Sequence, residues 1–159
     1  MLEKDHPIGV MFVCMGNICR SPMAEAVFQH LVDEKGLSTR FHLSSSAVGS
    51  WHVGQKPHPG TEAILKQHNI PLHPEKRSEL LKPFQLKQYD FILAMDQEIV
   101  DNIKSMYGIR LKKLMEFAPD GSLLEVPDPY YDHKFKLVYD LVTAGCEGLL
   151  DFICKEYGI

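Results

Sequence analysis

Apolar positions along the chain follow two different spacings, which divide it into alternating strand-like and helix-like segments. Nearly continuous apolar runs, typical of strands buried on both faces, occupy 8–13 and 89–95. Two less apolar segments, 41–48 and 112–117, are the other expected strands. The pattern therefore predicts four strands, separated by segments of a different periodicity.

The segments between and after these strands carry apolar residues at the spacing of an amphipathic helix. The first helix is expected to begin at Ser21 as N-cap, with Pro22 at the first helical position, and to end before Gly36. Such alternation indicates an α/β fold in which helices cover both faces of a parallel sheet, and ligands of such folds bind at the carboxyl ends of the strands. The remaining expected elements are helices over 61–67, 99–107 and 135–153 and a loop over 118–133.

The length fits one domain, spanning 1–159, that can bury a core without covalent staples. The formal net charge is −4, so no basic field favours a nucleic-acid partner. No apolar run reaches the roughly eighteen residues that a membrane span needs. The residues at 1–7 mix both charges and lack the layout of a signal peptide. We therefore expect a cytoplasmic protein in which any affinity for anions is created locally.

Four cysteines raise the question of disulfides or a bound metal. They are Cys14, Cys19, Cys146 and Cys154, an even number that would allow a two-bridge secreted scaffold. The missing signal peptide and the chain length argue against such a scaffold. A structural metal is disfavoured because no C-x2-C pair and no histidine pair at ligand spacing occurs. We expect reduced thiols and no metal.

The loop expected after the first strand holds a C-x5-R-S pattern made of Cys14, Arg20 and Ser21. The bare pattern is weak, but here it lies between a buried strand and a helix start, where backbone N–H groups and the positive helix end form an anion site. Gly16 lets the backbone approach a ligand closely. Arg20 supplies a planar fork that can bind two phosphoryl oxygens at once. The loop is therefore a candidate phosphate-binding loop.

Cys14 is the candidate nucleophile of this loop. A thiol becomes strongly nucleophilic once it is ionised, and helix N-termini with neighbouring cations favour the ionised form. The Ser21 hydroxyl could donate a hydrogen bond to the thiolate. The alternative is an inert cysteine that ends a core strand, which is the commoner case for a free cysteine. The arginine, the glycine and the helix start favour the nucleophile.

A proton donor for the leaving oxygen is expected from the segment 126–132. Asp128 stands between two prolines, and a residue before proline is held out of helical conformation, so a stiff loop presents this carboxylate. It could protonate a departing phenolate and then deprotonate the attacking water, whereas the alternative for such a sequence is a plain turn. Tyr130, Tyr131 and Trp51 could wall a pocket for an aromatic ring; the alternative is ordinary packing.

With these residues in place, the chain resembles the low-molecular-weight protein tyrosine phosphatases over almost its whole length. The resemblance is carried by C-M-G-N-I-C-R-S-P-M-A-E at 14–25 and by D-P-Y-Y at 128–131. It implies a four-stranded parallel sheet flanked by helices, with no cofactor and no metal. It also implies hydrolysis of phosphotyrosine in proteins and peptides, and of small aryl phosphates, by a monomer that inorganic phosphate and other oxyanions inhibit.

Position by position, the resemblance implies Cys14 as the nucleophile that forms a phosphocysteine, Arg20 as the phosphate clamp and Asp128 as the general acid and base. The residues that it implies for substrate binding are Met15, Gly16, Asn17, Ile18, Cys19, Ser21, Trp51, Tyr130 and Tyr131.

The resemblance also implies supporting roles around the loop. Ser21 would tune the thiolate, and Asn17 would hold the loop in a strained shape with Ser45 as its hydrogen-bond partner. Cys19 falls where members of the family form a protective disulfide with the nucleophile, which predicts redox sensitivity.

The chain departs from the family pattern in two places. Family members often carry a structural histidine a few residues before an arginine; here Arg77 matches the arginine, Pro74 replaces the histidine, and His73 falls one residue early. The segment at 57–59 replaces a common Pro-x-Asp with Pro-His-Pro. We therefore do not assign the loop-support role to His73, and we attach no catalysis to His58.

Other functions would require different features. An arsenate reductase on the same fold would also use Cys14, but it needs resolving thiols, and no cysteine lies between Cys19 and Cys146. A phosphocysteine carrier of sugar transport would have little use for Asp128. A catalytically inactive phosphate-binding module would be expected to lack the cysteine, the arginine or the aspartate. A P-loop kinase is excluded because no G-x4-G-K-[ST] occurs.

Overall fold

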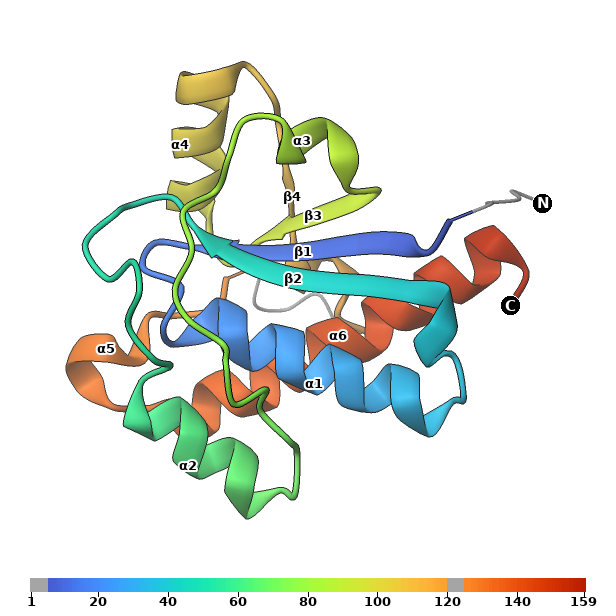
Figure 1. The fold of residues 1–159 in the computed structure, drawn as a ribbon, viewed down its shortest axis with the longest axis horizontal. Coiled ribbons are helices and arrows are strands. Elements are labelled where there is room, and N and C mark those ends of the chain that lie inside the picture. Colours follow the sequence, from blue (N-terminus) through green and yellow to red (C-terminus); the bar gives the residue numbers. More distant parts are fainter. Residues whose placement is uncertain (1–5, 120–124) are drawn as a thin grey trace.

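The computed structural model describes residues 6–119 and 125–159, which form a sheet between two layers of helices (Figure 1). Within these residues the sheet has four parallel strands in the order β2-β1-β3-β4. The predicted fold class is therefore confirmed. The strands are β1 (Ile8–Cys14), β2 (Phe41–Ala47), β3 (Phe91–Ala94) and β4 (Lys112–Lys113).

The helices divide between the two faces of the sheet. In Figure 1, α1, α2 and α6 lie on one face, and α3 and α4 lie on the other. The described residues include no helix with the length and hydropathy that crossing a bilayer would require. The helices are α1 (Arg20–Glu34), α2 (Pro59–Gln67), α3 (Gln85–Gln88), α4 (Gln97–Tyr107), α5 (Pro129–Asp132) and α6 (Phe135–Tyr157), with 3-10 turns η1 (Ser38–Arg40) and η2 (Leu114–Phe117).

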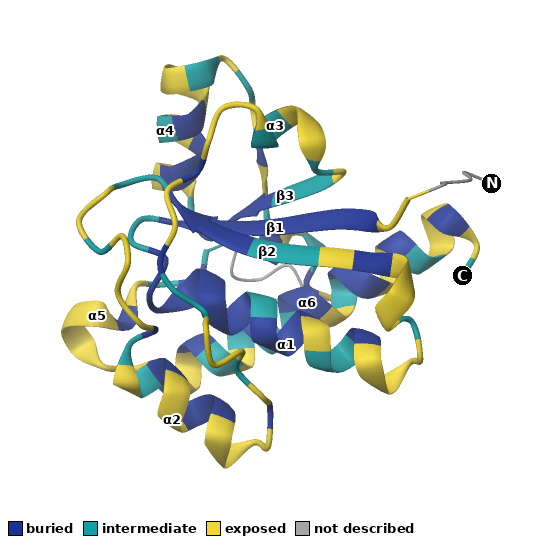
Figure 2. Cartoon of the chain, viewed as in Figure 1, coloured by how far each residue is buried: buried dark blue, intermediate teal, exposed yellow. Residues whose placement is uncertain are grey.

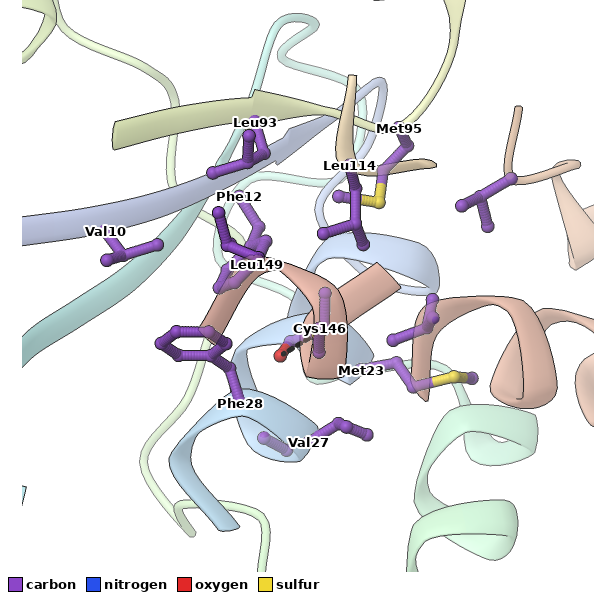
Figure 3. Close-up of a cluster of buried hydrophobic side chains, with 14 of the residues drawn as sticks. Val10, Phe12, Met23, Val27, Phe28, Leu93, Met95, Leu114, Cys146 and Leu149 are labelled. Carbon is purple, nitrogen blue, oxygen red and sulfur yellow. Dashed lines mark hydrogen bonds between the residues drawn. The ribbon is translucent and has the colours of Figure 1, made fainter. Parts of the chain in front are cut away.

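Strand β1 lies in the middle of the sheet, and every one of its residues is buried (Figure 2). Val10 and Phe12 belong to the large core on the α1 and α6 side, whereas Met11 belongs to the smaller core on the α4 side. Phe12 packs on Phe28 of α1 with 5.7 Å between ring centroids, and Leu149 of α6 lies in the same cluster (Figure 3). Burial on both faces fixes the strand that carries Cys14 at its end.

The start of α1 differs from the prediction. The helix begins at Arg20, with Cys19 as the N-cap, and Ser21 already lies inside the first turn. The Ser21 hydroxyl contacts Cys14 and Asn17. The prediction of Ser21 as the N-cap is therefore wrong, because its hydroxyl makes buried contacts with Cys14 and Asn17 and does not cap the helix.

The fourth strand is shorter than the predicted 112–117. Only Lys112–Lys113 pairs with β3, and the chain then turns into η2. The Lys113 N–H donates to the Glu116 carboxylate at 2.7 Å, which closes the turn. The turn lies directly against α6, where any side chain at Gly148 would meet the carbonyl of Phe117. Packing of the apolar turn against α6 thus overrides continuation of the strand.

Two short helices, α3 and α5, were not predicted. Helix α5 is a single turn inside the predicted loop 118–133, and Asp128 caps it by accepting the Tyr130 N–H at 3.0 Å. Residues 120–124 of that loop lie outside the described residues, as do residues 1–5 of the N-terminal segment. The other predicted elements shift only at their ends.

Candidate active site

The loop between β1 and α1 lies at the carboxyl end of the sheet and turns five of its carbonyl groups outward. Because the N–H and C=O groups of a peptide unit point in opposite directions, this arrangement directs the N–H groups toward the inside of the loop. The five accepting and donating pairs are Cys14 O with Val48 N–H, Met15 O with Gly49 N–H, Gly16 O with Ser78 Oγ, Ile18 O with His58 N–H, and Cys19 O with Thr61 Oγ1.

The inward N–H groups form a set of backbone donors for an anion. Within the described residues no acceptor is found for the N–H groups of Met15, Gly16, Ile18 and Cys19. Helix α1 starts directly after them, so its positive end adds to the same field. Free backbone donors at a helix N-terminus are a general means of binding phosphate.

Arg20 is fixed within this site. Its Nη1 donates to Asp96 Oδ2 at 2.6 Å and to the Val126 carbonyl at 3.0 Å, and its Nη2 lies 3.7 Å from Asp128 Oδ2. Burial by itself would lower the pKa of Arg20, but Cys14, Asp96 and Asp128 together raise that pKa above its ordinary value. The guanidinium is therefore buried, charged and held in one orientation.

Cys14 lies at the bottom of the loop, with two polar groups directed at its sulfur. The Ser21 hydroxyl is 3.0 Å from Cys14 Sγ, and the Asn17 N–H donates to the same sulfur at 3.2 Å. Ser21 Oγ also accepts a hydrogen bond from Asn17 Nδ2 at 2.7 Å. Since that bond occupies a lone pair of Ser21, the hydroxyl proton is free to point at the sulfur.

Asn17 connects the loop to the rest of the protein. It is fully buried in a left-handed backbone conformation with φ of 57°, and its Nδ2 also donates to Ser45 Oγ at 2.9 Å. Ser45 in turn donates to Glu25 at 2.6 Å. Lys76 Nζ lies 3.4 Å from Glu25 and donates to the Ser45 carbonyl at 3.0 Å. A continuous chain of polar contacts therefore runs from Lys76 to the sulfur of Cys14.

Asp128 stands at the mouth of the site. Its side chain is 43% exposed, with Oδ2 facing the guanidinium of Arg20 at 3.7 Å. Its Oδ1 accepts the Tyr130 N–H at the start of α5. One carboxylate oxygen thus holds the loop, while the other faces Arg20.

These groups surround a pocket of about 380 Å³. It brings together the predicted nucleophile, clamp, acid and aromatic residues, whereas Ser21 and Ser45 lie behind its floor and do not line it. The lining residues are Cys14, Met15, Gly16, Asn17, Ile18, Cys19, Arg20, Trp51, His52, Asp128, Tyr130 and Tyr131.

Aromatic side chains form the rim of the pocket. Trp51 and Tyr131 are strongly exposed, at 72% and 84%. Tyr130 packs edge-on against Tyr131, at 5.0 Å between centroids, and against His52 at 5.4 Å. Gly16 is required beneath them, since a Cβ there would come within 2.7 Å of the His52 ring. The rim offers aromatic surface to a ligand whose anionic end reaches Cys14.

His58 occupies a structural position beside the pocket. Its Nδ1 accepts the Gly60 N–H at 2.9 Å, which caps α2, and its own N–H donates to Ile18 O at 2.7 Å. Its ring stacks on Phe135 with 5.0 Å between centroids. Burial, followed by the charge of His133, lowers the pKa of His58. His58 thus contacts the loop through its backbone N–H, and α2 and α6 through its side chain.

His73 does not support the loop. It is exposed, and its Nδ1 accepts the N–H of Glu75 at 3.1 Å. The support at this side comes from Lys76, three residues further along. Arg77 donates to the carbonyl groups of Pro74 and Lys76.

Several residues of the site were not predicted from the sequence. Asp96 carried a usable signal, because it directly follows a buried strand and precedes a helix, which places it at the carboxyl edge of the sheet. Glu25, Lys76, Ser78 and His52 carried none, since only the tertiary fold brings them to the loop.

All four cysteines are free. Burial, then the charges of Cys14 and Asp128, raise the pKa of Cys19 to about 12, although Arg20 acts in the opposite direction. Cys19 is therefore a neutral thiol at neutral pH. The described residues contain no group of three or more His, Cys, Asp or Glu side chains placed to hold a metal ion.

Comparison with known proteins matches this geometry to one family. The family model described as low molecular weight phosphotyrosine protein phosphatase matches residues 9–157. The low molecular weight protein-tyrosine-phosphatase YfkJ of Bacillus subtilis is 42% identical over 94% of this chain and 97% of its own, and PtpA of Staphylococcus aureus is 43% identical over 94% and 96%.

Solved structures agree with this match. The crystal structure of Bacillus subtilis YfkJ has a TM-score of 0.92 at 40% identity, covering 97% of this chain and 99% of that one. A Drosophila arginine phosphatase has a TM-score of 0.84 at 27% identity, covering 91% and 96%.

Proposed function

The chain belongs to the low molecular weight phosphotyrosine protein phosphatase family, and on that premise we propose that it hydrolyses phosphotyrosine through a phosphocysteine on Cys14. Membership in the family makes the protein a phosphatase. One observation supports the detailed assignment most strongly. The loop turns its carbonyl groups outward, so free N–H groups and the buried Arg20 surround a single sulfur.

The phosphoryl group binds at the loop before any bond changes. Its oxygens accept hydrogen bonds from the inward N–H groups and from the guanidinium of Arg20, which is already held by Asp96. Donors that are oriented in advance stabilise the charge that develops on those oxygens without reorganising. No metal ion is needed for this role.

In the first step the Cys14 thiolate attacks phosphorus and the bond from phosphorus to the phenolic oxygen breaks. Asp128, protonated at this stage, gives its proton to the departing oxygen, so that a neutral phenol leaves. Ser21 and the Asn17 N–H hold the sulfur by their hydrogen bonds. The product of the step is a phosphocysteine on Cys14.

In the second step water attacks the phosphocysteine. Asp128, now a carboxylate, takes a proton from that water, the bond from sulfur to phosphorus breaks, and the thiolate and inorganic phosphate are released. Asp128 suits both roles, because its side chain lines the pocket and is 43% exposed, and Oδ2 is not the oxygen that accepts the Tyr130 N–H.

The aromatic rim favours an aryl phosphate as substrate. A phenyl ring that enters the pocket can pack against Trp51 and Tyr131, and the floor beside Cys14 is lined by the apolar side chain of Ile18. Because an arginine phosphatase shares the fold, phosphoarginine is the informative competitor. Its guanidinium would call for acceptors, and among the described lining residues Asp128 supplies the single carboxylate.

The test is the hydrolysis of p-nitrophenyl phosphate and of a phosphotyrosine peptide at mildly acidic pH with excess EDTA, comparing wild type with Cys14→Ser. We expect turnover in the wild type and a loss of about a thousandfold or more in the variant, which should still bind phosphate or vanadate. Full activity in the Cys14→Ser variant would refute the assignment of Cys14 as the nucleophile. Faster hydrolysis of phosphoarginine than of the phosphotyrosine peptide would refute the substrate class.

Two further assays separate the alternative functions, an arsenate reductase on the same fold and a phosphocysteine carrier. Freshly reduced wild type that reduces arsenate but leaves aryl phosphates intact would be a reductase. A phosphocysteine that persists and passes its phosphate to another protein would identify a carrier. We further propose that the enzyme acts as a monomer in the cytoplasm, where reducing conditions keep the Cys14 and Cys19 thiols available, and that inorganic phosphate inhibits it.

A further inference from the structure

A second cavity, of about 610 Å³, lies between α2 and the segment at 69–77, outside the catalytic pocket. Basic residues form part of its lining, namely Lys56, Lys66, Lys76 and Arg77. We propose that this cavity binds acidic side chains of the phosphotyrosine protein that occupies the active site. The inference rests on the proposed function and adds to it a preference for acidic sequence around the phosphotyrosine.

The cations of this cavity have no anionic partners of their own. Across the described residues, no ion pair is formed by Lys56, Lys66 or Arg77, whereas Lys76 is paired with Glu25. Lys56 and Lys66 are exposed, so their ammonium groups are free to move toward a ligand. The chain carries a formal net charge of −4, so these unpaired cations in one concavity stand out against an acidic background. Such an arrangement attracts carboxylates by local field rather than by overall charge.

Arg77 is the ordered donor among these cations. It is partly buried, and its Nη1 donates to the carbonyl groups of Lys76 at 2.9 Å and Pro74 at 3.3 Å. These bonds fix the plane of the guanidinium and use only one of its nitrogens. In the described part of the chain Nε and Nη2 have no hydrogen-bond acceptor, so one edge of the fork remains for a carboxylate.

Two residues that follow lining residues of the cavity hydrogen-bond to the outer side of the active-site loop. Pro57 lines the cavity, and the next residue, His58, donates its N–H to the loop carbonyl of Ile18 at 2.7 Å. Arg77 lines the cavity, and the next residue, Ser78, donates to the loop carbonyl of Gly16 at 2.8 Å. An extended substrate chain advances about 3.3 Å per residue, so the acidic side chains that reach this cavity belong to residues flanking the phosphotyrosine and not to the phosphotyrosine itself.

The size of the cavity favours an acidic peptide over a single small anion. Its volume lies in the range of sites that enclose ligands of many atoms, and its cations are spread along the wall from Lys56 to Arg77. Glu62 also lines the cavity and opposes an anion there. Lys56, Lys66 and Arg77 outnumber this one carboxylate, so the net charge of the unpaired groups in the cavity is positive.

The experiment compares two phosphotyrosine peptides of equal length, one with Asp and Glu flanking the phosphotyrosine and one with Asn and Gln at the same positions. We expect a higher kcat/KM for the acidic peptide in the wild type. In the double variant Lys56→Gln, Lys66→Gln, kcat/KM for the acidic peptide should fall about threefold to tenfold, chiefly through KM, as for exposed ion pairs. Hydrolysis of p-nitrophenyl phosphate and of the neutral peptide should stay unchanged.

A matched control removes the same charge elsewhere. Lys87 and Lys104 are exposed on α3 and α4, across the sheet from α2 (Figure 1). The variant Lys87→Gln, Lys104→Gln should leave the preference for the acidic peptide intact. Arg77→Lys, which keeps the charge but removes the fork, should lower that preference without affecting p-nitrophenyl phosphate.

The outcomes separate this inference from the proposed function. Equal kcat/KM for the two peptides in the wild type, or equal losses in the Lys56/Lys66 and Lys87/Lys104 variants, would overturn the acidic-peptide site while leaving a tyrosine phosphatase. Absence of turnover on every aryl phosphate would instead overturn the proposed function itself.

Discussion

Lys76 lies 3.4 Å from Glu25, and this pair stands at the outer end of the polar chain that reaches Cys14. The Lys76 side chain is only 10% exposed and that of Glu25 is 24% exposed, so the pair is partly shielded from water. Lys76 lies beside the Glu25 carboxylate that accepts the hydrogen bond of the Ser45 hydroxyl, and it donates to the Ser45 carbonyl as well. The pair therefore sets the orientation of Ser45, and through it that of Asn17.

We expect Lys76→Met to weaken both the fold and the reaction. Removing one partner of a shielded pair leaves the Glu25 carboxylate unpaired, which we expect to cost about 1–2 kcal/mol of unfolding free energy, less than for a deeply buried pair. If about 1 kcal/mol of that support reaches the transition state, kcat falls roughly fivefold. Urea unfolding and p-nitrophenyl phosphate kinetics measure the two effects. Lys76→Arg should keep most of the unfolding free energy and most of kcat. An unaltered kcat in Lys76→Met would show that the Lys76–Glu25 pair does not influence the reaction at Cys14.

Asp128→Ala should discriminate between leaving groups. A poor leaving group, such as an unsubstituted phenol, depends on the proton from Asp128, and its kcat should fall by about 10²–10⁴-fold. An activated leaving group such as a dinitrophenol needs no proton, so its rate should fall far less. Steady-state kinetics on a series of aryl phosphates checks this prediction. Equal losses of kcat across the series would contradict the assignment of Asp128 as the general acid.

Cys19 should resist alkylation while Cys14 reacts. The pKa of Cys19 is raised to about 12 by burial and by its anionic neighbours, so almost no thiolate exists there at neutral pH. Iodoacetamide at pH 7 should therefore label Cys14 first, with loss of activity, and bound phosphate should protect it. Peptide mass spectrometry identifies the labelled site. Labelling of Cys19 ahead of Cys14 would contradict the assignment of the two thiols.

Protonation of His58 should lower the free energy of unfolding as the pH is decreased. Its pKa is lowered in the folded state, so the unfolded chain binds the extra proton more readily, and stability declines as the pH falls below about 6.5. Protonation also removes the acceptor that caps α2 at Gly60. The loss continues until the pH is below the folded pKa.

The matched variant for this effect is His58→Asn, which retains a side-chain acceptor for the cap but does not titrate. Thermal unfolding from pH 7.5 to 5 should show a shallower decline in the variant than in the wild type. Parallel declines in the two proteins would show that other groups cause the acid sensitivity.

Sequence reasoning reached the parts of the site that are local in the chain. Cys14 and Arg20 lie within one strand–loop–helix unit, and the pair of prolines around Asp128 marks its loop without any tertiary information. The buried strand at 8–13 was also recognisable, because its apolar run matches burial on both faces. These features depend on neighbours in sequence.

The features that sequence reasoning missed depend on packing between distant segments. Ser21 was predicted as an N-cap because its position beside Pro22 has that local signature, yet its hydroxyl is drawn to Cys14 and Asn17. The segment at 114–117 has strand-like composition but turns because α6 covers it. Lys76 reaches Glu25 across about a third of the chain, which no local pattern reveals.

The outward carbonyl groups of the loop also tie ligand binding to the folding of the whole chain. Their partners are spread from Val48 to Ser78, so the loop takes its shape only after several segments have assembled around it. An oxyanion that binds the loop therefore selects the native state over every partly folded one. At one hundred times its dissociation constant, such a ligand adds about 2.7 kcal/mol to the unfolding free energy of the entire protein. If the loop binds phosphate as we propose, inorganic phosphate, the product of the reaction, is also a thermodynamic stabiliser of the enzyme that releases it.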